Sequence, residues 1–328
     1  MTRHLFLRFC LAALWSLLLA PVRAWSGMEP RLMKRRKVPL PITPVPEFYV
    51  EDYSGPPKNL SLDRWRLRIE GDVSHPALFT YSDLLARPSR KQFATLNCIG
   101  NPVGGHAIGN AEWEGISLGK LIETADPGFF ANTLVLKGAD GYHESIPLRK
   151  AFHPGALLAL KMNGEPLSAD HGFPLRLLIP GLYGIKQMKW VETLEIRRGS
   201  YEGYWQKQGW SREAGVKIVS RIDHPENDAT LARGTVTVRG IAFAGDRGIQ
   251  YVQVSTDEER TWTLARLDPP LSPWSWVFWS STHRFSQPGR YTLAVRAADN
   301  YSGVQRDDLR DPFPSGTSGI HRIGINVV

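Results

Sequence analysis

Cys98 is the residue of this chain whose type and neighbours point most directly to chemistry. The sequence has two cysteines, and the other, Cys10, lies in an apolar N-terminal segment. If that segment is removed on export, Cys98 has no disulfide partner and is a buried structural residue, a nucleophile or a metal ligand. Glycine and asparagine crowd the residues after it, as expected where backbone approaches a ligand, in Cys98-Ile99-Gly100-Asn101-Pro102-Val103-Gly104-Gly105.

Three later segments also combine turn residues with charged or hydrogen-bonding side chains. They are Gly138 to Tyr142, Met162 to Arg176 and Pro180 to Trp190. Taken singly, each has a structural explanation: Asn163-Gly164 is typical of a type I′ hairpin turn, and His171 could be bonded to backbone. Their common order and spacing are poorly explained by chance.

In this order the four segments resemble the sulfite oxidase family of molybdenum enzymes. The resemblance covers about Phe48 to the C-terminus, and it is most specific in Met162 to Leu167, Asp170 to Arg176 and Lys189-Trp190. It implies an oxidoreductase with a mononuclear molybdenum–molybdopterin cofactor that transfers an oxygen atom to or from a small molecule. It also implies that Cys98 is the catalytic metal ligand, because the soft thiolate suits a high-valent molybdenum that also carries a dithiolene.

The resemblance further implies which residues bind the cofactor. The donors of His171, Arg176 and Lys189 suit a pterin and its phosphate, and the guanidinium fork of Arg176 suits phosphate in particular. Backbone groups can supply many of the other contacts. The expected cofactor site consists of Tyr49, Val50, Glu51, Asp52, Tyr53, Cys98, Asp140, His171, Arg176, Gln187, Met188 and Lys189.

The chain departs from the sulfite-oxidising members at three positions. Glu51 and Val103 stand where those enzymes have arginine, and Trp210 stands where they have tyrosine. A site for an oxyanion needs cationic donors, so we expect a substrate other than sulfite, either another oxyanion or an oxo compound. The residues that could restore positive charge are Arg149, Lys186, Lys207 and Arg310.

Two functions of other kinds stay open at this point. A secreted, non-enzymatic binding protein could keep the fold without the metal, as the changes at Glu51 and Val103 would allow. The retention of Cys98, His171 and Arg176 counts against it. A hydrolase with Cys98 as nucleophile and His171 as base is the second alternative, but no papain-like signature surrounds the cysteine.

Composition and charge limit the kinds of partner that the chain can have. The chain has 328 residues, 42% of them apolar and 22% charged, which is typical of globular protein and allows about two domains. The net charge is +8, but the basic residues are scattered outside Lys34-Arg35-Arg36-Lys37. We therefore expect a small anionic ligand or an acidic partner, and no nucleic acid. No Cys-x-x-Cys-His haem motif occurs, so a separate electron carrier such as a cytochrome is expected.

The N-terminus has the features of an export signal. Arg3 and Arg8 precede an apolar run from Leu11 to Ala20, and Val22-Arg23-Ala24 offers small residues for cleavage. We expect a periplasmic or secreted protein, anchored to the membrane if the signal is retained. No twin-arginine pair precedes the apolar run.

Four parts are expected along the chain: a signal peptide or anchor (1–24), a basic proline-rich lead-in (25–46), a molybdopterin-binding domain (47–203) and a β-sandwich (204–328). In the first domain we predict strands at 65–69, 133–137 and 175–179. Helices are predicted at 118–125 and from a cap at Ser82 or Asp83, which together indicate a mixed α+β fold. Later alternating runs predict an all-β sandwich of immunoglobulin type, at 235–238, 249–255, 261–265, 274–279, 291–297 and 323–327. In the resembling family this is a dimerisation domain, so a homodimer is expected.

Overall fold

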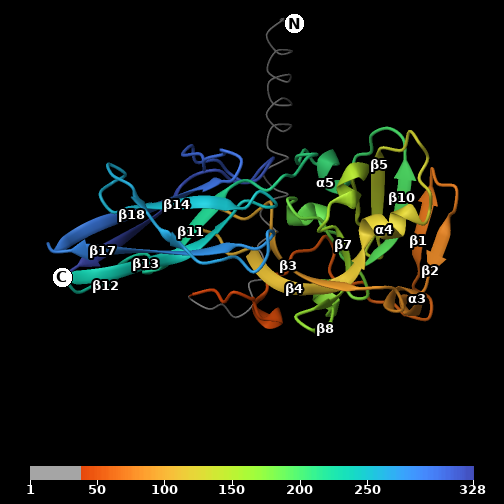
Figure 1. Cartoon of the computed structure of the whole chain (residues 1–328), viewed down its shortest axis with the longest axis horizontal. Coiled ribbons are helices and arrows are strands. Elements are labelled where there is room, and N and C mark those ends of the chain that lie inside the picture. The colour runs from red at the N-terminus through yellow and green to blue at the C-terminus, as the bar shows by residue number, and fades with distance from the viewer. Residues whose placement is uncertain (1–37) are drawn as a thin grey trace, which may run out of the picture. The chain divides into compact units, whose positions relative to one another are not determined.

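The computed structural model of the protein describes residues 38–328. The predicted signal peptide and the basic run of the lead-in lie outside the described residues. Among residues 38–328, no helix is long and apolar enough to cross a membrane. The described chain is rich in sheet, with short helices in its first half and strands throughout its second half (Figure 1).

The first half builds two sheets from short strands. The strands are β1 (Leu67–Gly71), β2 (Ala77–Phe79), β3 (Arg90–Asn97), β4 (Ile108–Ser117), β5 (Thr133–Gly138), β6 (His143–Pro147), β7 (Leu157–Met162), β8 (Glu165–Pro166), β9 (Arg176–Leu178) and β10 (Val191–Arg197). One sheet has the order β2-β1-β10-β5-β6, and only the β1–β10 pair within it is parallel. The other has the order β3-β4-β7-β8, with β9 paired to β7.

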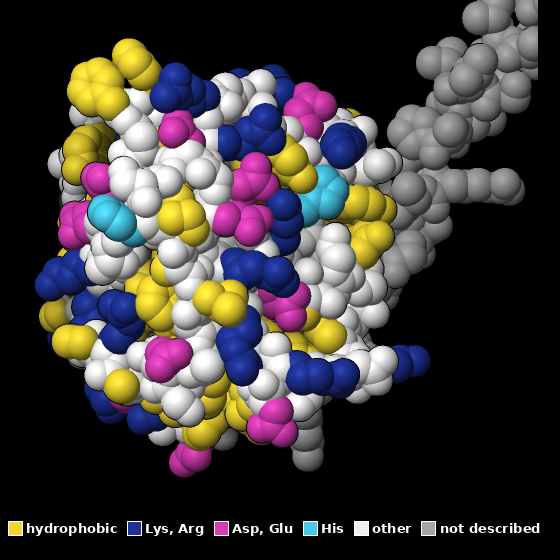
Figure 2. All heavy atoms as spheres, turned by 90° about the vertical axis from the view of Figure 1, so that its right-hand side faces the viewer, with side chains coloured by type: hydrophobic (Ala, Val, Ile, Leu, Met, Phe, Trp, Pro, Cys, Tyr) yellow, Lys and Arg dark blue, Asp and Glu magenta, His cyan; other side chains and the backbone are white. Residues whose placement is uncertain are grey.

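Short helices connect these strands and cover the sheets. They are η1 (Val45–Glu47), α3 (Tyr81–Leu85), α4 (Leu118–Glu123), η2 (Leu148–Phe152), η3 (Ala169–His171), η4 (Gly184–Lys186) and α5 (Tyr204–Lys207). Helix α4 buries Leu118, Leu121 and Ile122 in a core shared with β1, β5 and β10, at the spacing of one helix face. On the outer face shown in Figure 2, Lys and Arg side chains are interspersed with Asp and Glu.

The second half is a sandwich of two sheets. Its strands are β11 (Val219–His224), β12 (Ala229–Leu231), β13 (Gly234–Phe243), β14 (Ile249–Ser255), β15 (Thr263–Leu264), β16 (Arg266–Leu267), β17 (Val277–Phe285), β18 (Gly289–Asp299) and β19 (His321–Val327). The sheet orders are β11-β13-β17-β16 and β12-β19-β18-β14-β15. Apolar side chains of both sheets, among them Val238, Trp279 and Leu293, fill one core.

Two local predictions are wrong. Helix α3 is capped by Thr80, because Thr80 Oγ1 accepts from Asp83 N at 3.1 Å while Asp83 accepts from Thr80 N at 2.8 Å. Asp83 is thus the third helical residue of a capping box and not the cap. The strand predicted from Trp274 begins only at Val277, because the preceding residues bond to Thr95 of β3 instead. Trp274 O accepts from Thr95 N, and Trp276 N donates to Thr95 Oγ1.

One apolar cluster joins the two halves. It contains Ile99, Ile108 and Tyr183 from the first domain, and Trp210 and Trp276 from the segments that follow. Ile99 directly follows Cys98, so the loop after the cysteine lies at the domain junction.

Candidate functional site

Cys98 begins the loop between β3 and β4, and backbone hydrogen bonds fix its position. Its N–H donates to Ala107 O at 2.9 Å, and its carbonyl accepts from Asn101 N at 3.1 Å. The Asn101 side chain closes the loop, because its Oδ1 accepts from Ala107 N at 2.9 Å and its Nδ2 donates to Asn97 at 3.1 Å. The free thiol is buried and accepts from Gly100 N at 3.4 Å.

The surroundings of Cys98 favour a neutral thiol in the protein alone. Burial raises the pKa of Cys98 to about 12, with Glu51 adding to the rise and the Gly100 N–H opposing it. A nucleophilic cysteine needs its pKa lowered, commonly by a nearby imidazolium. His171 instead faces the Val45 carbonyl at 3.3 Å and packs edge-on against Phe48. This arrangement is poor for the cysteine hydrolase.

The loop 49–53 brings polar side chains close to the cysteine and its basic neighbours. The Tyr49 hydroxyl is buried without a protein partner. The Tyr49 hydroxyl and Cys98 both lie near Gly184, where a Cβ would be 3.4 Å from Tyr49 Oη and 3.9 Å from the Cys98 Cα. Asp52 accepts from Gly55 N at 2.7 Å and lies 3.5 Å from Lys189 Nζ. The other three members differ in exposure: Val50 is buried, Glu51 is half-buried and Tyr53 is exposed.

Three basic side chains gather behind this loop. The buried Arg176 donates to His171 O at 3.1 Å and stacks over Trp113 at 5.5 Å, while its Nε has no protein partner. Lys189 donates to Asp170 O at 3.0 Å. Burial lowers the pKa of all three, to about 4 for His171, about 10 for Arg176 and about 8 for Lys189. Near pH 7 His171 is therefore neutral, while Arg176 and Lys189 hold positive charge against a desolvation cost that an anionic ligand would offset.

The side chains of the remaining predicted cofactor residues, Asp140, Gln187 and Met188, are bonded or packed within the protein. Asp140 lies in the β5–β6 turn, where its carboxylate accepts from Tyr142 N at 3.1 Å. Gln187 uses its amide inside the protein, accepting from Ile179 N at 3.3 Å and donating to Leu182 O at 2.7 Å. Met188 is packed in the core. A cofactor contact at Gln187 or Met188 would therefore come from the main chain.

Of the three departures from the sulfite enzymes, Glu51 lies near Cys98, while Val103 and Trp210 pack at the domain junction. Burial, followed by the nearby Asp52, raises the pKa of Glu51 to about 7. Val103 packs toward the second domain, where a Cβ on Gly319 would lie 3.3 Å from it. Trp210 is buried in the apolar cluster at the junction and contacts Phe313 edge-on.

Two of the four residues expected to restore positive charge, Lys186 and Arg310, are paired with acidic side chains. Lys186 is buried in an ion pair with Glu144 at 2.7 Å and also donates to Ser145 O. Arg310 is exposed and paired with Asp308 at 2.5 Å. Arg149 and Lys207 lie outside the buried core.

Tyr183 is a buried neighbour of the Cys98 loop that the sequence did not single out. Its ring is buried in the cluster that holds Ile99, and its hydroxyl accepts from Lys217 N at 3.2 Å. Burial raises the pKa of Tyr183 to about 12, and Cys98 contributes to that rise. The only sequence signal was its position between glycines in the segment from Pro180 to Trp190.

Comparisons with known proteins agree with this geometry. Residues 54–205 match the family model of the oxidoreductase molybdopterin binding domain, and residues 213–312 match that of the Mo-co oxidoreductase dimerisation domain. Mitochondrial sulfite oxidase of Homo sapiens is 31% identical over 82% of this chain and 58% of its own length. Sulfite oxidase of Arabidopsis thaliana is 28% identical over 82% of this chain and 83% of its own length. The chain belongs to the sulfite oxidase family of molybdopterin-binding oxidoreductases.

A solved structure has the same fold. The sulfane dehydrogenase SoxCD of Paracoccus pantotrophus superposes with a TM-score of 0.78 and 24% identity, over 91% of this chain and 85% of that one. This likeness confirms the predicted architecture, a mixed α+β molybdopterin domain followed by an immunoglobulin-like sandwich. The chain spans about 60% of the length of the animal sulfite oxidases that it matches.

The residues present fit the molybdenum–molybdopterin cofactor of the family. The Tyr49 hydroxyl and Arg176 Nε are buried polar groups without protein partners, which costs about 1–3 kcal/mol each unless a ligand bonds to them. The basic residues beside them suit a phosphate, and a single thiolate suits a molybdenum ion that also has sulfur ligands from its cofactor. Among residues 38–328, no group of three or more His, Cys, Asp or Glu side chains is placed to hold a metal ion.

Proposed function

We propose that this protein is an exported molybdenum oxidoreductase that transfers an oxygen atom to or from a small oxo compound other than sulfite. The observation that carries the proposal is the hydrogen-bonded loop that fixes Cys98 beside buried donors without protein partners. Cys98 would hold the metal, while Tyr49, His171, Arg176 and Lys189 would hold the pterin and its phosphate. When bound, the cofactor supplies two-electron chemistry and oxygen-atom transfer.

The side chains around Cys98 support a substrate with little negative charge. The carboxyl of Glu51 is near enough to raise the pKa of the thiol, so a negative charge there would repel an approaching anion. Val103 packs against Gly319 and Trp210 is buried in the junction cluster, so neither supplies the donor that an arginine and a tyrosine give the sulfite enzymes at these positions. Sulfoxides and N-oxides are compounds of the required kind, because their oxygen is polar while the molecule is neutral.

Partners and location are part of the same proposal. The match of the second domain to a dimerisation domain supports a homodimer. A separate electron carrier, such as a cytochrome, would pass electrons to or from the site. The signal-like N-terminus supports a periplasmic or secreted location.

Metal analysis of purified protein, made with molybdate in a host that synthesises the cofactor, tests the proposal. We expect about one molybdenum per chain, with turnover of sulfoxides or N-oxides exceeding that of sulfite. Cys98→Ser should lose turnover while keeping its fold. A well-folded wild-type protein without molybdenum would overturn the proposal and favour the metal-free binding protein.

A further inference from the structure

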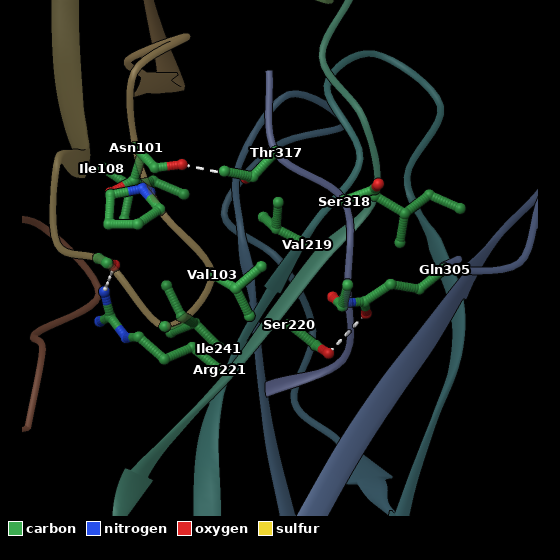
Figure 3. A pocket seen from close by; sticks show the side chains of 15 residues that line it. Asn101, Val103, Ile108, Val219, Ser220, Arg221, Ile241, Gln305, Thr317 and Ser318 are labelled. Atoms are coloured by element: carbon green, nitrogen blue, oxygen red, sulfur yellow. Dashed lines mark hydrogen bonds between the residues drawn. The ribbon is translucent and has the colours of Figure 1, made fainter. Parts of the chain in front are cut away.

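Side chains of the second domain hold the loop that follows Cys98. Arg221 of β11 donates from Nη1 to Gly105 O at 2.7 Å, and Thr317 donates from Oγ1 to Asn101 O at 3.0 Å (Figure 3). Gly104 has a left-handed φ of 73° and lies against the His321 ring, where a Cβ would overlap the imidazole. Residues of the second domain therefore contact loop 101–105 at three points.

A buried ion pair with Asp223 fixes the orientation of the Arg221 side chain. Its side chain is 8% exposed, and its Nε donates to Asp223 Oδ1 at 2.7 Å, on a side chain that is 1% exposed. A buried charge pair of this kind is costly to form and is held in one geometry by its hydrogen bonds. Asp223 thus aims the guanidinium fork, and the second arm of the fork reaches Gly105.

A short path along the chain and through hydrogen bonds leads from Arg221 to the backbone of Cys98. Gly105 lies two residues before Ala107, and Ala107 O accepts from Cys98 N while Ala107 N donates to Asn101 Oδ1. The space between loop 101–105 and the sandwich is a cavity of about 20 Å³, room for roughly one water molecule. The loop therefore has little freedom to shift without moving Cys98.

We infer that Arg221 is a positioning residue for Cys98, through which the second domain sets where the thiol lies. The inference rests on the proposed function for its catalytic meaning, since Cys98 is the metal ligand in that proposal. It assigns the second domain a part in the active site in addition to any part in dimerisation. Loop 101–105 serves here as a junction between domains, with Val103 facing the sandwich.

Hydrogen exchange of the cofactor-free protein tests the inference without depending on catalysis. In Arg221→Met, the backbone amides of Cys98, Asn101 and Ala107 should exchange about tenfold faster or more, as expected when a charged hydrogen bond is lost. Arg221→Lys keeps the charge opposite Asp223 and should give a smaller increase. Arg290→Met is the matched control, because Arg290 pairs with Asp228 at 2.8 Å on the surface of the same sandwich, and in this variant loop 101–105 should exchange as in wild type.

The holoenzyme provides a second measurement. The Mo(V) electron paramagnetic resonance spectrum should change in Arg221→Met, and kcat should fall while KM for substrate stays near the wild-type value. If Arg221→Met does not fold, Arg221→Lys and Thr317→Val are measured in its place. The inference would be overturned if this loop exchanged at the wild-type rate in a folded variant that lacks the Arg221 or Thr317 hydrogen bond. Absence of molybdenum would refute the proposed function but leave the exchange result standing.

Discussion

The buried ion pair between Lys186 and Glu144 gives a prediction with a large expected effect. The two side chains are 1% and 0% exposed, and Lys186 Nζ lies 2.7 Å from Glu144 Oε1. Burial lowers the pKa of Lys186 while Glu144 opposes that fall. Removing one partner of such a pair leaves an uncompensated buried charge, so Lys186→Met should lower the free energy of unfolding by about 3–5 kcal/mol.

Urea unfolding of the cofactor-free protein measures this loss. With a typical m-value of about 1–3 kcal/mol per molar, the midpoint should fall by about 1 M or more. The double variant Glu144→Gln with Lys186→Met should recover part of the loss. It leaves no buried charge unpaired. The amide oxygen of the introduced glutamine can still accept from Ser145 N, and its amide nitrogen can donate to Tyr142 Oη, whose own proton goes to Ile185 O. The matched control Arg290→Met breaks a pair whose side chains are 61% and 58% exposed and should cost less than about 1 kcal/mol. A loss in Lys186→Met no larger than in this control would refute the reasoning.

Three further predictions concern the site. Burial lowers the pKa of His171 to about 4, below its unfolded value of about 6.5, so the unfolded chain binds the extra proton first. The free energy of unfolding should therefore fall by up to about 3 kcal/mol as pH drops from about 6.5 to about 4. In urea unfolding measured at each pH, His171→Gln should show a smaller pH dependence than wild type. An equal pH dependence in the two proteins would contradict this assignment of the pH effect to His171. Glu51→Gln removes a carboxylate beside Cys98, so KM for sulfite should fall while KM for a neutral sulfoxide changes little. Steady-state kinetics in which the variant changes both KM values equally would count against a substrate selected for low negative charge. Trp210→Ala opens a cavity in the junction cluster and should cost about 3–5 kcal/mol in urea unfolding, and a loss below about 1 kcal/mol would mean that Trp210 is not packed as described.

Local pattern predicted much of the fold. Helix α4 and strand β14 lie where apolar periodicity placed them, and Asn163 and Gly164 have the two positive φ values that a type I′ turn requires. The strand predicted from Trp274 failed for a physical reason. Its first residues bond to Thr95, about 180 positions earlier, and alternation in one segment carries no information about such a partner.

The candidate site divides in the same way. The motif around Cys98 could be found from sequence, because turn residues and a lone cysteine leave a local signature. The pairing of Lys186 with Glu144 and the contact of Arg221 with Gly105 could not, since they join residues 42 and 116 positions apart. The sequence therefore suggested Lys186 as a source of positive charge, whereas the fold uses that charge to neutralise Glu144.

The central claim is that Cys98 binds the molybdenum, and X-ray absorption at the molybdenum edge tests it most directly. The measurement compares the number of sulfur atoms bound to the metal in wild type and in Cys98→Ser, both loaded in a cofactor-competent host. We predict that the variant has one sulfur fewer. The same number of sulfur ligands in both proteins would contradict the claim.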